Sequence, residues 1–168
     1  MSSSFLVFGA GAWGTALSIQ LLNSNNRVFL SSFDEVNLNK IKKDRENKKY
    51  LPGFRLQKEL IVQPFSEKLV EGVDSIVVCV KSPYFKDAVL ALKSGLNDKN
   101  LIWATKGFDP NSGGLLSTMV TEEITTKAKT AILSGPTFAE ELAAGKPAAI
   151  TLATKVIDNS VSLAESMS

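Results

Sequence analysis

The chain has 168 residues, 44% of them hydrophobic and 21% charged, and a formal net charge of +2 at pH 7. These totals exclude a disordered or strongly polyelectrolytic chain and leave enough apolar surface to bury the core of a single domain. One cysteine and no histidine exclude an intrachain disulfide, a histidine-based metal site and a Ser-His-Asp triad, so we expect no bound metal.

The amino-terminal stretch, MSSSFLVFG, has neither the basic residues nor the long apolar run of a secretory signal. No apolar run later in the chain approaches the roughly 18 residues that a membrane span requires. The cysteine, Cys79, lies in the apolar run SIVVCV, where we expect a buried and inert thiol. We therefore expect a cytoplasmic protein without a membrane span.

The first motif follows a short apolar strand predicted at Leu6–Phe8. Gly9, Gly11 and Gly14 have the spacing G-x-G-x-x-G, and a helical pattern begins at once. In such a motif the first glycine permits a tight turn, the second lets the backbone approach a pyrophosphate, and the third lets the helix pack on the strand. The helix N-terminus also attracts phosphate. The motif therefore predicts a dinucleotide site, and the alternative is a glycine-rich turn that binds nothing.

The second predicted strand, Arg27–Phe33, leads into Asp34 and a helix expected from about Glu35 to Lys48. Asp34 is placed to cap that helix. It also follows Gly14 by 20 residues, where an acidic side chain would bind the ribose hydroxyls of a dinucleotide, and the two interpretations stay open. No arginine stands beside Phe33 to hold a 2′-phosphate, which favours NAD slightly over NADP.

The basic residues are densest in the run Lys40–Lys49, where Asp44–Glu46 interrupt them. Such an interrupted run is typical of a solvated helix face, so we expect no nucleic-acid partner. The following stretch, Tyr50–Leu56, contains Pro52-Gly53 and is predicted to be a turn-rich excursion.

The rest of the chain alternates apolar strand patterns with helical patterns across short connections. This alternation predicts βαβ units, and so an α/β fold with a doubly wound, mostly parallel sheet and helices on both faces. The further strands are expected at Ile61–Gln63, Ser75–Val80, Leu101–Thr105, Thr130–Leu133 and Ala148–Thr154. Helical spacing follows at Phe85–Leu92, at Leu116–Ile124, after Thr137 and in the closing stretch VIDNSVSLAESMS, where the chain ends as a truncated one would.

Three polar clusters follow predicted strands: Lys81-Ser82, Lys106-Gly107 and Ser134–Thr137. Ligands of open α/β sheets bind beyond the carboxyl ends of the strands, so we expect these clusters on the same rim as the glycine motif. Lys106 can present its ammonium group to an anion or a polarised oxygen, and the alternative is a solvated loop lysine.

The segment Ser134–Thr137 offers N–H groups and hydroxyls to an anionic or hydroxylated substrate. Thr137 and Glu140 also have the S/T-x-x-E spacing of a capping box, so the alternative is that Thr137 only caps a helix. Trp13 stands where its ring would cover the pyrophosphate region, or where it would simply pack the helix.

Four segments together resemble the bacterial NAD(P)-dependent glycerol-3-phosphate dehydrogenases. They are GAGAWGTAL, LPGF, WATKGF and SGPTFAEELAAGKPAAI, in that family's order and spacing, and the resemblance extends from Phe5 to about Thr154. It implies a Rossmann-type fold and reversible hydride transfer between a nicotinamide and dihydroxyacetone phosphate or sn-glycerol 3-phosphate, a reaction that feeds glycerophospholipid synthesis.

The resemblance and the residue patterns together define the expected site. The expected cofactor-binding residues are Gly9, Gly11, Ala12, Trp13, Gly14, Phe33, Asp34, Lys106 and Ala139. The expected substrate-binding residues are Lys106, Gly135 and Thr137. Two positions depart from the family: Phe33 replaces a residue that is often basic or polar, and Lys81 replaces a usual proline.

The resemblance also implies a second, helical domain that carries the lysine acting as general acid/base. We expect residues 1–168 to be the NAD(P)-binding domain without that helical domain, so no catalytic residue is assigned in this chain. It should bind dinucleotide weakly, turn over little or no substrate, and self-associate as a homo-oligomer through exposed apolar surface. The alternatives are another small reductase of the hydroxyacid or ketopantoate type, and a non-catalytic dinucleotide sensor.

Overall fold

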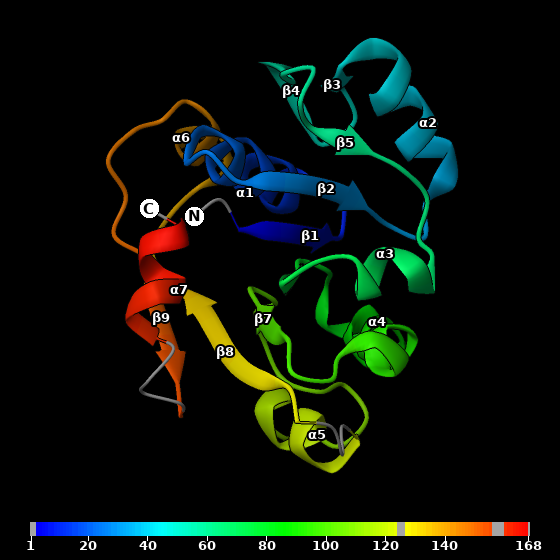
Figure 1. Cartoon of the computed structure of the whole chain (residues 1–168), viewed down its shortest axis with the longest axis vertical. Helices are drawn as coiled ribbons and strands as arrows, with labels where there is room; N and C mark the ends of the chain where they lie inside the picture. Colours follow the sequence, from blue (N-terminus) through cyan, green and yellow to red (C-terminus); the bar gives the residue numbers. More distant parts are fainter. Residues whose placement is uncertain (1–2, 124–126, 156–159, 168) are drawn as a thin grey trace.

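The computed structural model describes residues 3–123, 127–155 and 160–167, and a seven-stranded sheet forms the centre of this part (Figure 1). The strand order is β5-β2-β1-β6-β7-β8-β9; neighbouring strands are parallel as far as β8, and β9 runs antiparallel to β8. The strands are β1 (Ser4–Phe8), β2 (Arg27–Ser31), β5 (Ile61–Val62), β6 (Ser75–Val78), β7 (Asn100–Trp103), β8 (Lys129–Ser134) and β9 (Thr151–Thr154).

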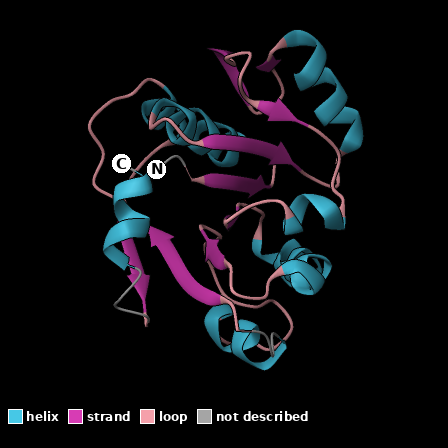
Figure 2. Cartoon of the chain, viewed as in Figure 1, coloured by secondary structure: helices cyan, strands magenta, loops and turns pink. Residues whose placement is uncertain are grey.

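Helices cover both faces of this sheet (Figure 2). Buried side chains of one face belong to α1 (Ala12–Asn23), α2 (Glu35–Asp44), α6 (Ala139–Ala143) and α7 (Ser160–Met167). Those of the other face belong to α3 (Glu67–Glu71), α4 (Phe85–Leu92) and α5 (Leu116–Glu123). Two short 3-10 helices, η1 (Ser82–Tyr84) and η2 (Lys93–Gly95), flank α4.

The first strand shows why the core has two halves. Successive side chains of a strand point to opposite faces. Phe5 and Val7 therefore pack with the first group of helices, and Leu6 and Phe8 pack with the second, all four fully buried. The doubly wound, mostly parallel sheet predicted from the alternating pattern is confirmed.

The predicted elements are present, with changed limits. The second, fourth and fifth expected strands end two residues early, at Ser31, Val78 and Trp103, and the last begins at Thr151 rather than Ala148. The last predicted helix is confirmed over Ser160–Met167. The rest of that predicted stretch, residues 156–159 and 168, lies outside the described part, as does Ile124.

The helix expected to reach Lys48 ends at Asp44, because Arg45 adopts a left-handed conformation with φ 53°. The guanidinium of Arg45 donates to the carbonyl of Leu60 at 3.1 Å and also to that of Gln57. These contacts turn the chain away from the helix axis and toward the segment before β5.

A small antiparallel hairpin follows this turn, in place of the end of the expected helix and of the turn-rich excursion expected at Tyr50–Leu56. It pairs β3 (Glu46–Asn47) with β4 (Leu51–Arg55). The Asn47 side chain is fully buried, and its amide donates to the Ala10 carbonyl at 3.0 Å and to Thr15 Oγ1 at 2.8 Å. The hairpin is therefore tied to the glycine motif.

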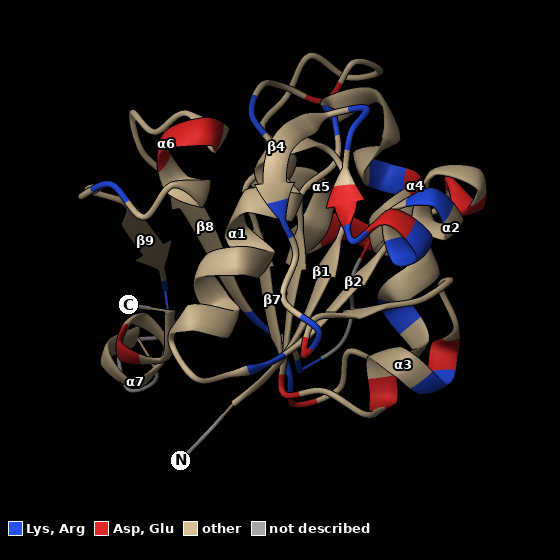
Figure 3. Ribbon diagram, turned by 90° about the horizontal axis from the view of Figure 1, so that it is seen from above, with Lys and Arg blue, Asp and Glu red and all other residues tan. Residues whose placement is uncertain are grey.

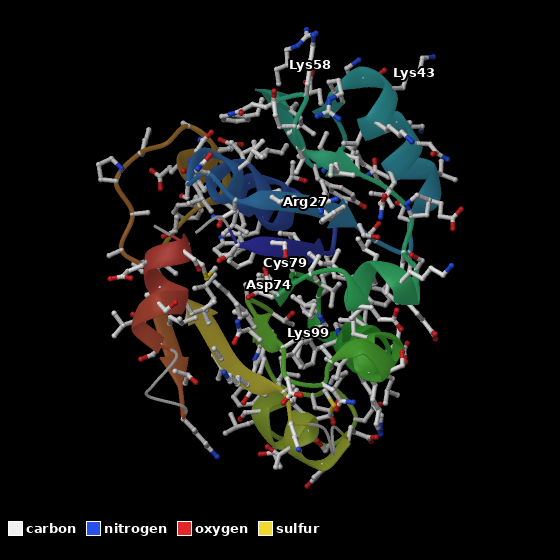
Figure 4. All side chains as sticks on the ribbon, in the orientation of Figure 1. Arg27, Lys43, Lys58, Asp74, Cys79 and Lys99 are labelled. Carbon is white, nitrogen blue, oxygen red and sulfur yellow. The ribbon has the colours of Figure 1, made fainter. Side chains whose placement is uncertain are left out.

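Charged residues gather on α2, α3 and the hairpin, whereas α1 contains none (Figure 3). Lys43 and Lys58 point outward from this side of the molecule (Figure 4). None of the helices within the described residues is long and apolar enough to span a membrane.

Candidate functional site

The carboxyl ends of β1, β2 and β6 meet at one point of the sheet. The chain runs from β1 to β2 on one side and later reaches β6 on the other, so β1 is where the strand order reverses. Open α/β sheets bind ligands in the crevice at such a point. The N–H of Gly9 donates to the Ser31 carbonyl at 2.8 Å, and the N–H of Cys79 donates to the Phe8 carbonyl at 2.8 Å. These bonds hold the three strand ends around the glycine motif.

Two glycines of the motif are required by close packing. A Cβ at Gly9, where φ is +123°, would lie 2.4 Å from the Cys79 carbonyl oxygen. A Cβ at Gly14 would lie 2.0 Å from the Gly9 carbonyl oxygen. Gly9 therefore permits the approach of β6, and Gly14 permits α1 to start directly against the turn.

Gly11 differs from these two glycines. A Cβ built on it meets no atom of the described residues within 4 Å, and its φ of −80° and ψ of −172° suit any residue. Neither packing nor backbone strain of this chain explains a glycine here. The absence of a side chain leaves the backbone open to a ligand, which is what a pyrophosphate needs, so the residues present fit a dinucleotide.

The amino terminus of α1 faces the same opening. Gly11 is its N-cap, and the first residues, Ala12 and Trp13, are half-buried. The first N–H groups of an α-helix have no acceptor within the helix, and the helix dipole makes this end positive. This arrangement favours an anionic group next to Gly11.

Trp13 joins the glycine motif to the segment after β8, since its indole N–H donates to the Thr137 carbonyl at 3.3 Å. The expected capping box of Thr137 and Glu140 is wrong. The N-cap of α6 is Phe138, which is extended at φ −86° and ψ 147° and makes no side-chain capping bond. Thr137 is buried before the helix begins.

Gly135 and Ala139 also have structural reasons for their small size. A Cβ on Gly135 would lie 2.6 Å from the Ala149 carbonyl oxygen, so the approach of the chain before β9 requires glycine. Ala139 begins α6 and packs against the core. Neither contact precludes a role in binding.

The clusters after β6 and β7 lie together. The position of a Cβ on Gly107, where φ is +104°, is 3.5 Å from Ser82 Oγ. Lys106 and Lys81 are exposed, while Thr105 is buried and its hydroxyl has no hydrogen-bond partner among the described residues. The structure therefore brings the two predicted clusters, which contain Ser82 and Lys106, together at the carboxyl ends of β6 and β7. The buried Thr105 hydroxyl beside them has no partner among the described residues.

The carboxylate of Asp34 makes two contacts. Oδ1 accepts the N–H of Asn37 at 2.9 Å, which confirms the helix cap, and Oδ2 lies 3.2 Å from Lys49 Nζ. The bond from Asn37, followed by the contact with Lys49, lowers the pKa of Asp34. Phe33 beside it is 56% exposed, with its ring edge-on to Phe8 at 4.9 Å between centroids.

Lys49 and Tyr50 also lie in this region, and no sequence motif predicted them as site residues. Lys49 Nζ lies 4.7 Å from the centre of the Tyr50 ring, and contacts with Tyr50 and then Asp34 raise its pKa. Both residues lie in the hairpin turn. Glu46 and Arg55 carry opposite charges on the two sides of Pro52-Gly53, and they are paired across the hairpin. This charge pattern is the sequence signal that would have predicted the hairpin.

Cys79 lies near the middle of the molecule, after β6 (Figure 4). The residue is partly exposed, but burial of its thiol raises the pKa to about 12. The expected inert thiol is therefore supported, because reaction requires the thiolate.

Comparison with known proteins gives a consistent result. Residues 4–160 match the family described as NAD-dependent glycerol-3-phosphate dehydrogenase N-terminus. Glycerol-3-phosphate dehydrogenase [NAD(P)+] of Aliivibrio fischeri is 39% identical over 152 residues, which are 90% of this chain and 44% of that protein. The enzyme of the same name from Colwellia psychrerythraea is 36% identical over 156 residues, 92% of this chain and 47% of that protein.

Among solved structures, glycerol-3-phosphate dehydrogenase of Coxiella burnetii superposes with a TM-score of 0.92 at 29% identity. The match covers 99% of this chain and 51% of the Coxiella chain. This chain thus spans about half the length of the relatives that it matches.

Proposed function

Because this chain belongs to the NAD-dependent glycerol-3-phosphate dehydrogenase N-terminal family, we propose that it forms the dinucleotide-binding domain of such an enzyme. The reaction is the interconversion of sn-glycerol 3-phosphate and dihydroxyacetone phosphate. The observation that carries the proposal is Gly11, whose missing side chain serves no packing or conformational need within the described residues. Residues 1–168 act as one domain in this proposal, since a single sheet carries both halves of the core.

The proposed roles follow the rim of the sheet. Gly9 and Gly14 shape the turn, while Gly11, Ala12 and Trp13 present backbone N–H groups and an indole face to the pyrophosphate. Phe33 and Asp34 lie toward the adenosine, and Ala139 toward the dinucleotide from α6. A bound nicotinamide would supply or accept the hydride at C2 of the substrate.

Lys106 is the proposed link between cofactor and substrate. Its exposed ammonium group stands at the carboxyl end of β7, where it can attract the substrate phosphate or the oxygen on C2. Gly135 and Thr137, on the segment after β8, are the proposed neighbours of the substrate. Hydride transfer also needs a proton donor and acceptor at the C2 oxygen, and this proposal assigns that role to a group other than Lys106.

Calorimetric titration of this chain with NADH and with NADPH, up to millimolar concentration, tests the proposal. We expect weak binding of dinucleotide, because the glycine turn is complete. The absence of heat with both dinucleotides would contradict the proposed function. An assay of dihydroxyacetone phosphate reduction should show little or no turnover by these 168 residues; rapid turnover would refute the assignment of Lys106 to binding alone.

Three finer assignments accompany this function. NAD is slightly favoured over NADP, because no arginine stands beside Phe33. The location is cytoplasmic. Exposed apolar residues, such as Phe138 at 76% exposure, promote self-association. Light scattering over a range of protein concentrations tests the last, and a mass that stays monomeric throughout would contradict it.

A further inference from the structure

The contact between Asp34 and Lys49 lies at the end of β2, next to the glycine motif. Asp34 follows β2, and the last residue of that strand, Ser31, accepts the N–H of Gly9 at 2.8 Å. Lys49 comes from the hairpin turn and reaches Asp34 with 3.2 Å between Nζ and Oδ2. A carboxylate and an ammonium group are thus presented together at the place where the fold binds the adenosine ribose.

The hairpin that carries Lys49 is fixed to the glycine motif rather than free at the surface. Asn47, two residues before Lys49, is fully buried and donates to the Ala10 carbonyl at 3.0 Å and to Thr15 Oγ1 at 2.8 Å. Thr15 Oγ1 in turn donates to the Gly11 carbonyl at 2.7 Å. The backbone of Lys49 therefore keeps a constant place relative to the proposed pyrophosphate site.

NAD and NADP differ only in a phosphate on the 2′-oxygen of this ribose. A carboxylate accepts hydrogen bonds from ribose hydroxyls but repels a phosphate, whereas an ammonium group attracts the phosphate. We propose that the Asp34–Lys49 pair sets the choice between the two dinucleotides. Lys49 binds the 2′-phosphate of NADP, and Asp34 weakens that binding by pairing with Lys49 and by repelling the phosphate. This proposal rests on the proposed function and names the residues that discriminate within that same site.

In this proposal a chain with no arginine beside Phe33 accepts both cofactors. While Lys49 is bound to Asp34, its charge is partly compensated, which leaves NAD slightly favoured. The 2′-phosphate of NADP competes with the Asp34 carboxylate for the Lys49 ammonium group. The new contact between phosphate and ammonium replaces part of the interaction that Lys49 loses with Asp34. Lys49 is 54% and Asp34 45% exposed, so solvent screens the competition and the expected effects are moderate.

The test uses three variants of this chain. Lys49→Met removes the ammonium group and keeps an unbranched side chain. Asp34→Asn removes the negative charge and keeps a good helix cap, since asparagine and aspartate are about equal at that position. Lys48→Met is the matched control, because Lys48 is a neighbouring exposed lysine that pairs with Asp44 at 2.9 Å, on the helix that precedes the hairpin.

Dissociation constants for NADH and NADPH are measured by calorimetry at one fixed ionic strength, then for NADPH at several salt concentrations. Lys49→Met should weaken NADPH binding about tenfold, change NADH binding less than about twofold, and reduce the salt dependence for NADPH. Asp34→Asn should strengthen NADPH binding several-fold relative to NADH. Lys48→Met should leave the ratio of the two constants as in the parent.

The outcomes separate this proposal from the function on which it rests. Equal effects of Lys49→Met on both dinucleotides, or the same effect from Lys48→Met, would overturn the role of the pair alone. An unchanged ratio in Asp34→Asn would do the same, and does not depend on the folding of the lysine variants. Failure of the parent to bind either dinucleotide would overturn both.

Discussion

Substitution of alanine at Gly11 and at Gly14 separates ligand binding from packing in one motif. The two glycines are three residues apart and receive the same added methyl group. At Gly14 that methyl would lie 2.0 Å from the Gly9 carbonyl oxygen, whereas at Gly11 it meets no described atom within 4 Å. The same chemical change should therefore act on stability at one position and on binding at the other.

The magnitudes follow from these distances. Since real Cβ contacts essentially never fall below 3.0 Å, Gly14→Ala must separate α1 from the turn by about 1 Å. Overpacking of this kind costs about 3 kcal/mol of unfolding free energy. At Gly11 the backbone conformation already suits alanine. Alanine is a weaker N-cap than glycine, but it also lowers the entropy of the unfolded chain, and the two effects oppose each other. The unfolding free energy of Gly11→Ala should therefore differ from that of the parent by less than about 1 kcal/mol.

Urea denaturation measures the stability of both variants, and calorimetry with NADH and NADPH measures their affinity. Gly11→Ala should unfold like the parent and bind both dinucleotides at least about tenfold more weakly, which is about 1.4 kcal/mol. Parent-like affinity in Gly11→Ala would refute the placement of the pyrophosphate against Gly11. Parent-like stability in Gly14→Ala would refute the packing argument.

Three further predictions concern groups outside the ligand contacts. Asn47→Asp replaces a buried amide donor by a carboxylate that faces the Ala10 carbonyl, and it should lower the unfolding free energy measured in urea by about 3 kcal/mol. A loss below about 1 kcal/mol would contradict the hydrogen bond between the hairpin and the glycine motif. The pKa of Cys79 is raised to about 12, above its usual 9.0, so the unfolded chain loses its thiol proton first and stability should fall from pH 9 toward pH 12, a loss that Cys79→Ala should reduce. Hydrogen bonds from the hydroxyl and N–H of Ser4 lower the pKa of Asp74, so its contribution is present above about pH 4 and is lost as pH falls through the lowered pKa. Asp74→Asn should flatten this acid limb of the stability profile, and an unchanged limb would argue against the contact.

Local patterns predicted most of the fold. The central strands of the main sheet were predicted because their burial on both faces selects continuous apolar runs, as in Ser75–Val78. The face of α4 was predicted because Phe85, Ala88, Val89 and Leu92 recur at helical spacing, and all four are fully buried. Element ends were predicted less well, because they depend on contacts such as those of Arg45 with distant carbonyls.

The candidate site divides in the same way. Gly9, Gly11 and Gly14 were identified by their spacing, because the whole G-x-G-x-x-G pattern lies in one short stretch of the chain. The short strands β3 and β4 had too few residues to show a period, so Lys49 and its contact with Asp34 were missed. The capping box was wrong because the chain stays extended through Phe138, so the helix begins one residue later than the spacing requires.

The sequence by itself determined which strands and helices follow one another along the chain, and where the glycine motif lies. Both follow from side-chain size and polarity along short stretches. It also indicated the family, through residue combinations that no periodicity explains. Only the tertiary structure decided which glycines are needed for packing and which is left open. The Cys79 backbone leaves no room for a side chain at Gly9, the Gly9 carbonyl leaves none at Gly14, and no described atom lies near Gly11. It likewise placed Lys49 beside Asp34, since the chain must fold back over a separation of 15 positions before the two charges can meet.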